Sequence, residues 1–191
     1  MSPKLSCVNI PHVLKNLSLL FIILLISGCS SSKKAIVADS LDETPVITGS
    51  VVNASALAKG GTLVLGAFNP GTGAAADDET DQLSSMIIKG IGDTLPEDNT
   101  PFTIQSSNEK DPDCFLEGYI ENYGRDGIPH QKLRKTQVFL SVDGDIWLRE
   151  TGEKIFLFQT SIVIDLKNQS SKEVAYEIGV AIAHFIGSHN T

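Results

Sequence analysis

Cysteine is the residue type whose position in this chain most clearly indicates chemistry. Cys29 follows Leu25-Ile26-Ser27-Gly28, an aliphatic pair and two small residues, at the end of the apolar run 17–26. A thiol is the side chain that can become a thioether, because sulfur is a strong nucleophile. The small side chains of Ser27 and Gly28 leave the backbone open to a processing peptidase. The alternative is a free cysteine at the end of an uncleaved membrane anchor.

The apolar run is too short to span a membrane as a helix. Its sequence, LSLLFIILLI, would rise about 15 Å, against about 30 Å for a hydrocarbon core. Lys15 limits the run upstream, and Lys4 and Lys15 give the segment a positively charged start. This pattern is typical of a signal peptide, so we expect residues 1–28 to be removed from the mature protein.

The segment around Cys29 resembles the bacterial lipobox. The resemblance implies cleavage before Cys29, a diacylglycerol thioether on its sulfur, and a further acyl chain such as palmitate on its new amino group. Acyl chains hold a protein on a bilayer at about 0.8 kcal/mol per buried CH₂. Ser30, as the second mature residue, implies lipid anchoring at the periplasmic face of the outer membrane. The residues implied for signal-cleavage recognition are Leu25, Ile26, Ser27 and Gly28.

Length and composition restrict what the rest of the chain can be. The 191 residues suit one domain with tails, and 41% hydrophobic with 20% charged residues is ordinary globular composition. The net charge is −8, and removing residues 1–28 would leave 13 basic and 23 acidic residues, a net charge of −10. This balance argues against binding to nucleic acid.

The remaining cysteines predict no internal disulfide. Cys7 would leave with the signal peptide, and Cys29 would be lipidated, so Cys114 would stand alone. Cys114 lies beside Phe115 and Leu116, which favours a buried apolar position. An intermolecular disulfide or a reactive thiol is the alternative.

Two motifs near residue 75 each have a structural and a ligand-binding interpretation. Gly71-x-Gly73-x-x-Ala76 matches the dinucleotide fingerprint loosely, but no convincing parallel βαβ unit follows it, so we expect no nucleotide. The acidic cluster that comes next favours a helix start, with calcium binding as an alternative and contact with a protein partner as another. Its members are Asp77, Asp78, Glu79 and Asp81.

No motif predicts catalysis, a metal or a cofactor. His184 and His189 are five residues apart, whereas four would align two ligands on one helix face. The patterns HExxH, CxxC and GxSxG do not occur. We therefore expect a protein that is not an enzyme.

Residues 29–61 are expected to form a lipidated N-terminus and flexible tether, and residues 62–191 a periplasmic domain. Short apolar pieces at 46–47 and 51–52 leave open an edge strand within the tether. The domain is predicted to be α+β, with the order β-α-β-β-β-β-α: a largely antiparallel or mixed sheet of about five strands and two helices packed on it. The strands are expected at 62–68, 102–104, 114–123, 138–148 and 155–166.

Turn and cap residues refine these elements. Residues 69–73 have loop chemistry, and Asp143-Gly144 fits either a type I′ turn or a bulge within one long strand. Residues 150–153 are a better turn. Ser170 and Glu173 form a capping box that begins the last helix, and Gly187 lies where a C-cap is expected.

The domain resembles periplasmic lipoprotein domains related to the curli-secretion lipoprotein and to the N-terminal domain of TolB. The resemblance rests on Gly61–Phe68 before an amphipathic helix, on Phe115–Ile120 with its small mid-strand residue, and on Thr151-Gly152-Glu153 at a hairpin. It covers about residues 62–187. The long segments that build the curli channel are absent, so no pore is implied.

Three functions are compatible with these features. The first is a non-catalytic accessory factor in envelope assembly or secretion that binds an envelope protein through a sheet edge or the acidic helix start. The second is an auxiliary lipoprotein subunit of an ABC-type lipid transport system. A hollow lined by Phe139, Trp147, Phe156 and Phe158 would favour it. The third is a hydrolase, which would need a polar cluster in a cleft.

Overall fold

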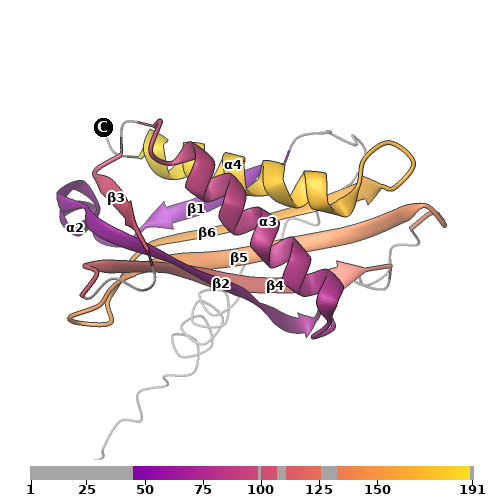
Figure 1. Cartoon of the computed structure of the whole chain (residues 1–191), viewed down its shortest axis with the longest axis horizontal. Coiled ribbons are helices and arrows are strands. Elements are labelled where there is room, and N and C mark those ends of the chain that lie inside the picture. Colours follow the sequence, from indigo (N-terminus) through magenta and orange to yellow (C-terminus); the bar gives the residue numbers. More distant parts are fainter. Residues whose placement is uncertain (1–44, 99, 107–110, 126–132, 190–191) are drawn as a thin grey trace, which may run out of the picture. The chain divides into compact units, whose positions relative to one another are not determined.

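A computed structural model describes residues 45–98, 100–106, 111–125 and 133–189. The chain divides into two units, Met1–Ser40 and Leu41–Thr191, and every described residue belongs to the second. This unit is a six-stranded mixed sheet with three helices (Figure 1). The elements are β1 (Ile47–Val51), α2 (Ala54–Lys59), β2 (Gly61–Gly73), α3 (Asp78–Thr94), β3 (Phe102–Gln105), β4 (Cys114–Gly124), β5 (Gln137–Leu148), β6 (Lys154–Asp165) and α4 (Ser171–Ser188). The predicted α+β class is confirmed, with one more strand and one more helix than expected.

The sheet has the order β1-β6-β5-β4-β2-β3. Neighbours from β1 to β4 pair antiparallel, whereas β2 is parallel to both β4 and β3. Parallel strands need a crossover connection, and α3 supplies it between β2 and β3. The expectation that no parallel βαβ unit follows β2 is therefore wrong. The apolar run of β3 is only a few residues long, which gave little sign of a strand beside β2.

Residues before Gly61 contribute to the sheet and its packing. Strand β1 pairs with β6 from Ile47↔Thr160 to Val51↔Phe156, so the edge strand that the sequence left open is present. Asn53 caps α2 by accepting a hydrogen bond from the Ala56 backbone N–H. Leu57 of α2 is 2% exposed and belongs to the main core.

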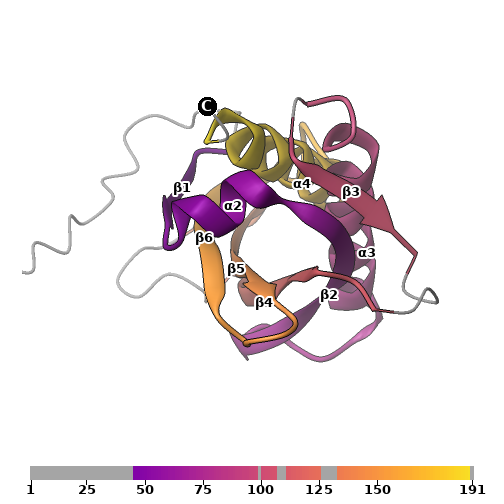
Figure 2. The same ribbon diagram turned by 90° about the vertical axis from the view of Figure 1, so that its left-hand side faces the viewer.

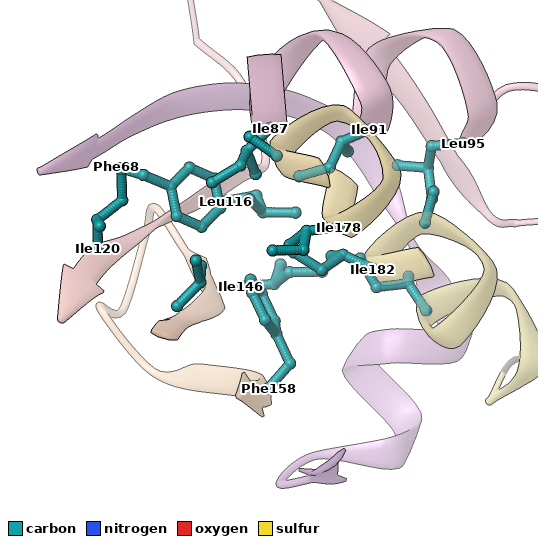
Figure 3. Packing of buried hydrophobic residues seen from close by; sticks show 14 of the residues in the cluster. Phe68, Ile87, Ile91, Leu95, Leu116, Ile120, Ile146, Phe158, Ile178 and Ile182 are labelled. Atoms are coloured by element: carbon teal, nitrogen blue, oxygen red, sulfur yellow. The ribbon is translucent and has the colours of Figure 1, made fainter. Parts of the chain in front are cut away.

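Helices α3 and α4 lie side by side across one face of the sheet (Figures 1 and 2). They cross at Gly90 and Gly179. If either glycine carried a Cβ atom, that atom would lie 3.0–3.1 Å from the Cα atom of the other glycine. A side chain at either position would overlap the backbone of the facing helix. This close approach brings the apolar stripes of both helices onto the strands beneath (Figure 3).

A pair of glycines in the central strands makes room for two aromatic rings of this core. Gly118 of β4 is paired with Gly144 of β5. A Cβ atom at Gly118 would be 2.8 Å from a Phe68 ring carbon, and one at Gly144 would be 2.5 Å from the Phe158 ring. The Phe68 and Phe158 rings pack with their centroids 6.3 Å apart. The small mid-strand residue is thus a packing requirement.

Several local predictions need correction. Residues 69–73 are strand and not loop, because β2 continues along β4 through two register shifts. Asp143-Gly144 is neither a turn nor a bulge, since β5 runs through it in unbroken register with β4. Helix α4 continues past Gly187, and its C-cap is His189.

Other local predictions are confirmed. The chain turns between Leu148 and Lys154, with Gly152 at a φ of +68° that suits glycine. Ser170 and Glu173 form the predicted capping box at the start of α4. Both helices pack on the sheet as expected.

Candidate functional site

The face of the sheet opposite α3 and α4 carries a shallow pocket formed by β4, β5 and the start of β6. Its volume is 350 Å³. Strand alternation places Phe115, Glu117 and Tyr119 of β4 on this face, because Cys114, Leu116 and Ile120 point into the core. We call this surface the open face. The residues that line the pocket are Glu117, Gly118, Tyr119, Asp145, Trp147, Gly152 and Lys154.

An aromatic pair forms one wall of the open face. Phe115 and Trp147 are cross-strand partners, and their rings stack with centroids 4.6 Å apart and planes 20° from parallel. Within the described part of the chain, the buried Trp147 Nε1 has no hydrogen-bond acceptor. Tyr119 is 51% exposed on the same face. The pocket therefore has an aromatic wall, and the indole N–H lies beneath its surface.

Carboxylates outnumber cations around the pocket. Glu117 lies opposite Asp145, and Tyr119 lies opposite Asp143. Lys154 donates to Asp145 Oδ2 at 2.6 Å, and this hydrogen bond raises the pKa of Lys154. Burial, followed by the nearby Glu121 charge, raises the pKa of Asp143, whose Oδ1 atom has no partner among the described residues. Directly opposed like charges destabilise a sheet, so this arrangement is not explained by stability.

The hollow of Phe139, Trp147, Phe156 and Phe158 that would have favoured a lipid-transport subunit does not form. Phe156 and Phe158 are 0% and 3% exposed in the core beneath the helices. Trp147 lies on the open face, and Phe139 has the same parity along β5. The four rings are therefore divided between the two faces of the sheet.

The predicted acidic cluster begins α3, as the sequence suggested. Asp77 is the N-cap, with its side chain accepting from the Thr80 backbone N–H at 3.0 Å. Asp78, Glu79 and Asp81 occupy the first turn and are exposed. Carboxylates here stabilise the positive end of the helix dipole. Their proposed contact with a partner stays a prediction.

Glu79 has a further structural role. Its Oε1 atom accepts from the Tyr123 hydroxyl at 2.6 Å, and Tyr123 Oη lies 2.8 Å from Ser171 Oγ at the start of α4. Burial, together with the Glu79 hydrogen bond, raises the pKa of Tyr123 to about 12. This contact joins the starts of α3 and α4 to the end of β4.

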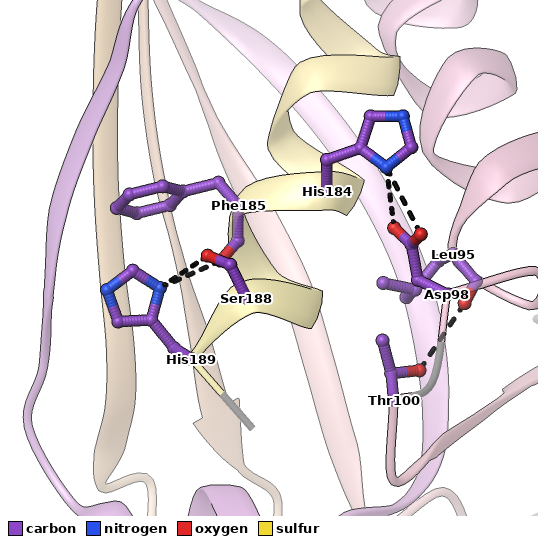
Figure 4. Close-up of polar contacts among 7 residues, drawn as sticks. All are labelled: Leu95, Asp98, Thr100, His184, Phe185, Ser188 and His189. Atoms are coloured by element: carbon purple, nitrogen blue, oxygen red, sulfur yellow. Dashed lines mark hydrogen bonds and ion pairs between the residues drawn. The ribbon is translucent and has the colours of Figure 1, made fainter. Parts of the chain in front are cut away.

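His184 of α4 and His189 at its C-cap contact different partners (Figure 4). His184 Nδ1 lies 3.0–3.1 Å from both Asp98 carboxylate oxygens, which connects α4 to the segment after α3. His189 packs edge-on against Phe185 and Phe156, with centroids 4.5 and 5.6 Å apart. The two imidazole rings therefore have separate hydrogen-bond partners.

Residues with other predicted roles fall into two groups. Cys29 and the recognition residues Leu25, Ile26, Ser27 and Gly28 lie outside the described residues. Cys114 is free and 0% exposed, as expected, and burial raises the pKa of its thiol.

In the described ranges there is no cluster of metal-ligating side chains. No helix in that part of the chain is long and apolar enough to cross a membrane.

Sequence reasoning missed the pocket. The alternation in β4 places Phe115, Glu117 and Tyr119 on one face. However, the pairing of Trp147 with Lys154 depends on a register shift after Ile146, which no sequence pattern indicates.

Comparison with known proteins gives weak structural likenesses. No protein-family model matches the chain, and no curated protein matches it. Two structures of the PelC dodecamer from Paraburkholderia phytofirmans, one of a point variant, superpose with a TM-score of 0.47 at 12% and 13% identity. Each match covers 73% of this chain and 96% of that one. A candidate lipoprotein from Caulobacter crescentus CB15 superposes with a TM-score of 0.38 at 11% identity, covering 71% and 92%.

At these values the likenesses support no functional argument. The resemblance to the curli-secretion lipoprotein and to TolB also stays a prediction. The function proposed next therefore rests on the residues of this chain.

Proposed function

We propose that this protein is a non-catalytic accessory factor of the bacterial cell envelope, anchored by Cys29 to the outer membrane and binding an envelope protein in assembly or secretion. The location rests on the lipobox-like segment Leu25–Cys29 behind a short apolar run. The binding role rests on the open face. No further substrate or cofactor is part of the proposal.

The single observation that carries the binding role is the pocket at Tyr119 and Trp147. The other face of the sheet is covered by α3 and α4, whereas this face keeps a half-exposed tyrosine and a stacked tryptophan. Tyr and Trp are enriched where protein surfaces bind partners, because they combine apolar area with a polar group. The open face is thus the proposed contact surface.

Site-specific photo-crosslinking in cells tests this surface. A photoreactive amino acid replaces Tyr119 on the open face in one strain and Glu177, which is exposed on α4, in another. We expect Tyr119 to give a discrete adduct with one envelope protein, identified by mass spectrometry, and Glu177 to give none. Equal adducts from both positions, or an adduct from Glu177 alone, would place the partner elsewhere.

A further inference from the structure

The charge around the pocket limits what the open face can bind. Glu117 and Asp145 face each other across β4 and β5, and Lys154 pairs with Asp145. Among the described residues no cation or hydrogen-bond donor contacts the Glu117 carboxylate, which is exposed. The ionisable groups that line the pocket therefore leave one negative charge uncompensated, with Asp143 and Glu121 nearby adding to it.

The aromatic wall favours a particular kind of cation. Trp147, which lines the pocket, is held in place by stacking on Phe115, and Tyr119 lines the same pocket. A guanidinium group packs flat on aromatic rings and binds a carboxylate through two N–H groups. An ammonium group is a strongly hydrated point charge, so its contacts with the aromatic ring and with the carboxylate are both weaker. Glu117 beside Tyr119 and Trp147 therefore suits arginine better than lysine.

The proposed function gives the open face a protein partner, so the arginine is taken to belong to a polypeptide. The fold closes Trp147 Nε1 off from solvent. A bound segment would therefore contact the aromatic rings and the Glu117 carboxylate, and not the indole N–H.

We propose that the open-face pocket binds an arginine side chain of a partner protein. The guanidinium lies against Tyr119 and Trp147 and pairs with Glu117. This inference rests on the proposed function, because it specifies the chemistry of the partner at that same face.

Trp147 makes the test direct, since it is the only tryptophan in the chain. The full-length protein in detergent is titrated at physiological salt with a short arginine-rich peptide, and tryptophan emission is recorded. Lysine-rich and glutamate-rich peptides of the same length and a neutral oligosaccharide serve as comparison probes. We expect a saturable emission change with the arginine peptide, weaker binding of the lysine peptide, and no binding of the other two.

Matched variants separate a specific site from general attraction to an acidic protein. Glu117→Gln should weaken arginine-peptide binding about tenfold, the usual loss for one charge-assisted hydrogen bond. Glu177→Gln removes the same charge from an exposed position on α4. It should leave the affinity for the arginine peptide within about twofold of wild type, as expected for a distant screened charge. Melting temperature and near-ultraviolet circular dichroism verify that both variants are folded.

Three results would overturn the inference. The first is equal weakening by Glu117→Gln and Glu177→Gln, which would show general charge attraction only. The second is a saturable signal from the oligosaccharide without one from the arginine peptide, which would identify a carbohydrate surface. The third is no emission change with any probe. If crosslinking from Tyr119 still succeeds in these cases, the proposed function stands while the arginine assignment fails.

Discussion

Asp113 joins the starts of two parallel strands through one carboxylate. The Thr62 backbone N–H and hydroxyl both donate to Asp113 Oδ2 at 2.8 Å. The Asp113 backbone N–H donates in return to Thr62 Oγ1 at 2.9 Å. Because the charged form accepts these bonds, first of all the backbone one, the pKa of Asp113 is lowered below its ordinary value. A single side chain thus fixes where β2 meets β4.

Asp113→Asn should lower the free energy of unfolding by about 1 kcal/mol at neutral pH, because it weakens an exposed charge-assisted contact. A carboxyl whose folded pKa is lowered stabilises the fold above its unfolded pKa, and this contribution disappears as pH falls through the folded value. The difference in the free energy of unfolding between Asp113→Asn and wild type should therefore stay constant from neutral pH down to about pH 4. It should shrink at lower pH. Urea unfolding across this range measures it.

The control for this prediction is Glu97→Gln, a change at an exposed carboxylate. It should alter stability little at any pH. If Asp113→Asn and wild type keep the same difference in acid as at neutral pH, the contact does not depend on the carboxylate charge.

The crossing of α3 and α4 depends on the absence of side chains at two positions. Gly179→Ala should destabilise the fold by about 1–3 kcal/mol, because the new methyl group would overlap the Ile87 carbonyl and push the helices apart. Gly92→Ala is the matched control on α3. Its Cβ atom would meet only a Leu65 methyl group at 3.6 Å, so a better helix former should leave stability unchanged or raise it.

Thermal and denaturant unfolding of the two glycine variants compares these effects. If Gly179→Ala lowers the free energy of unfolding and Gly92→Ala raises it, the helix crossing is set by contact between the two backbones. Destabilisation of the same size by both variants would instead indicate that contact at the crossing is not the cause.

Elements with strong local patterns could be predicted from the sequence, whereas the pairing of distant strands could not. The acidic start of α3 and the capping box at Ser170 depend on neighbours within one turn or two, so both helices were predicted. Strand β3 was expected at 102–104, but its parallel pairing with β2 was not. Local composition carries no sign of that pairing.

The candidate site shows the same limit at the scale of the whole molecule. Phe115, Glu117 and Tyr119 share a face by simple alternation along β4. Their proximity to Lys154 depends on the turn after Leu148 and on the register shift at Trp147. Phe156 and Phe158 pair with Ile146 and Gly144, so alternation along β5 places Trp147 on the opposite face from both rings.

Anchoring and partner binding are properties of separate parts of the chain, so they are separately testable. Cys29→Ala should abolish incorporation of labelled fatty acid and leave a larger, unprocessed protein, because the lipobox resemblance makes cleavage depend on the modified thiol. Cys7→Ala should incorporate label normally, since Cys7 would be removed with the signal peptide, and so should Cys114→Ala, whose side chain is buried. Gel mobility and metabolic labelling measure both effects. Continued labelling of Cys29→Ala would show that Cys29 is not the acylated residue, and the proposed location would then fail even if the open face bound its partner.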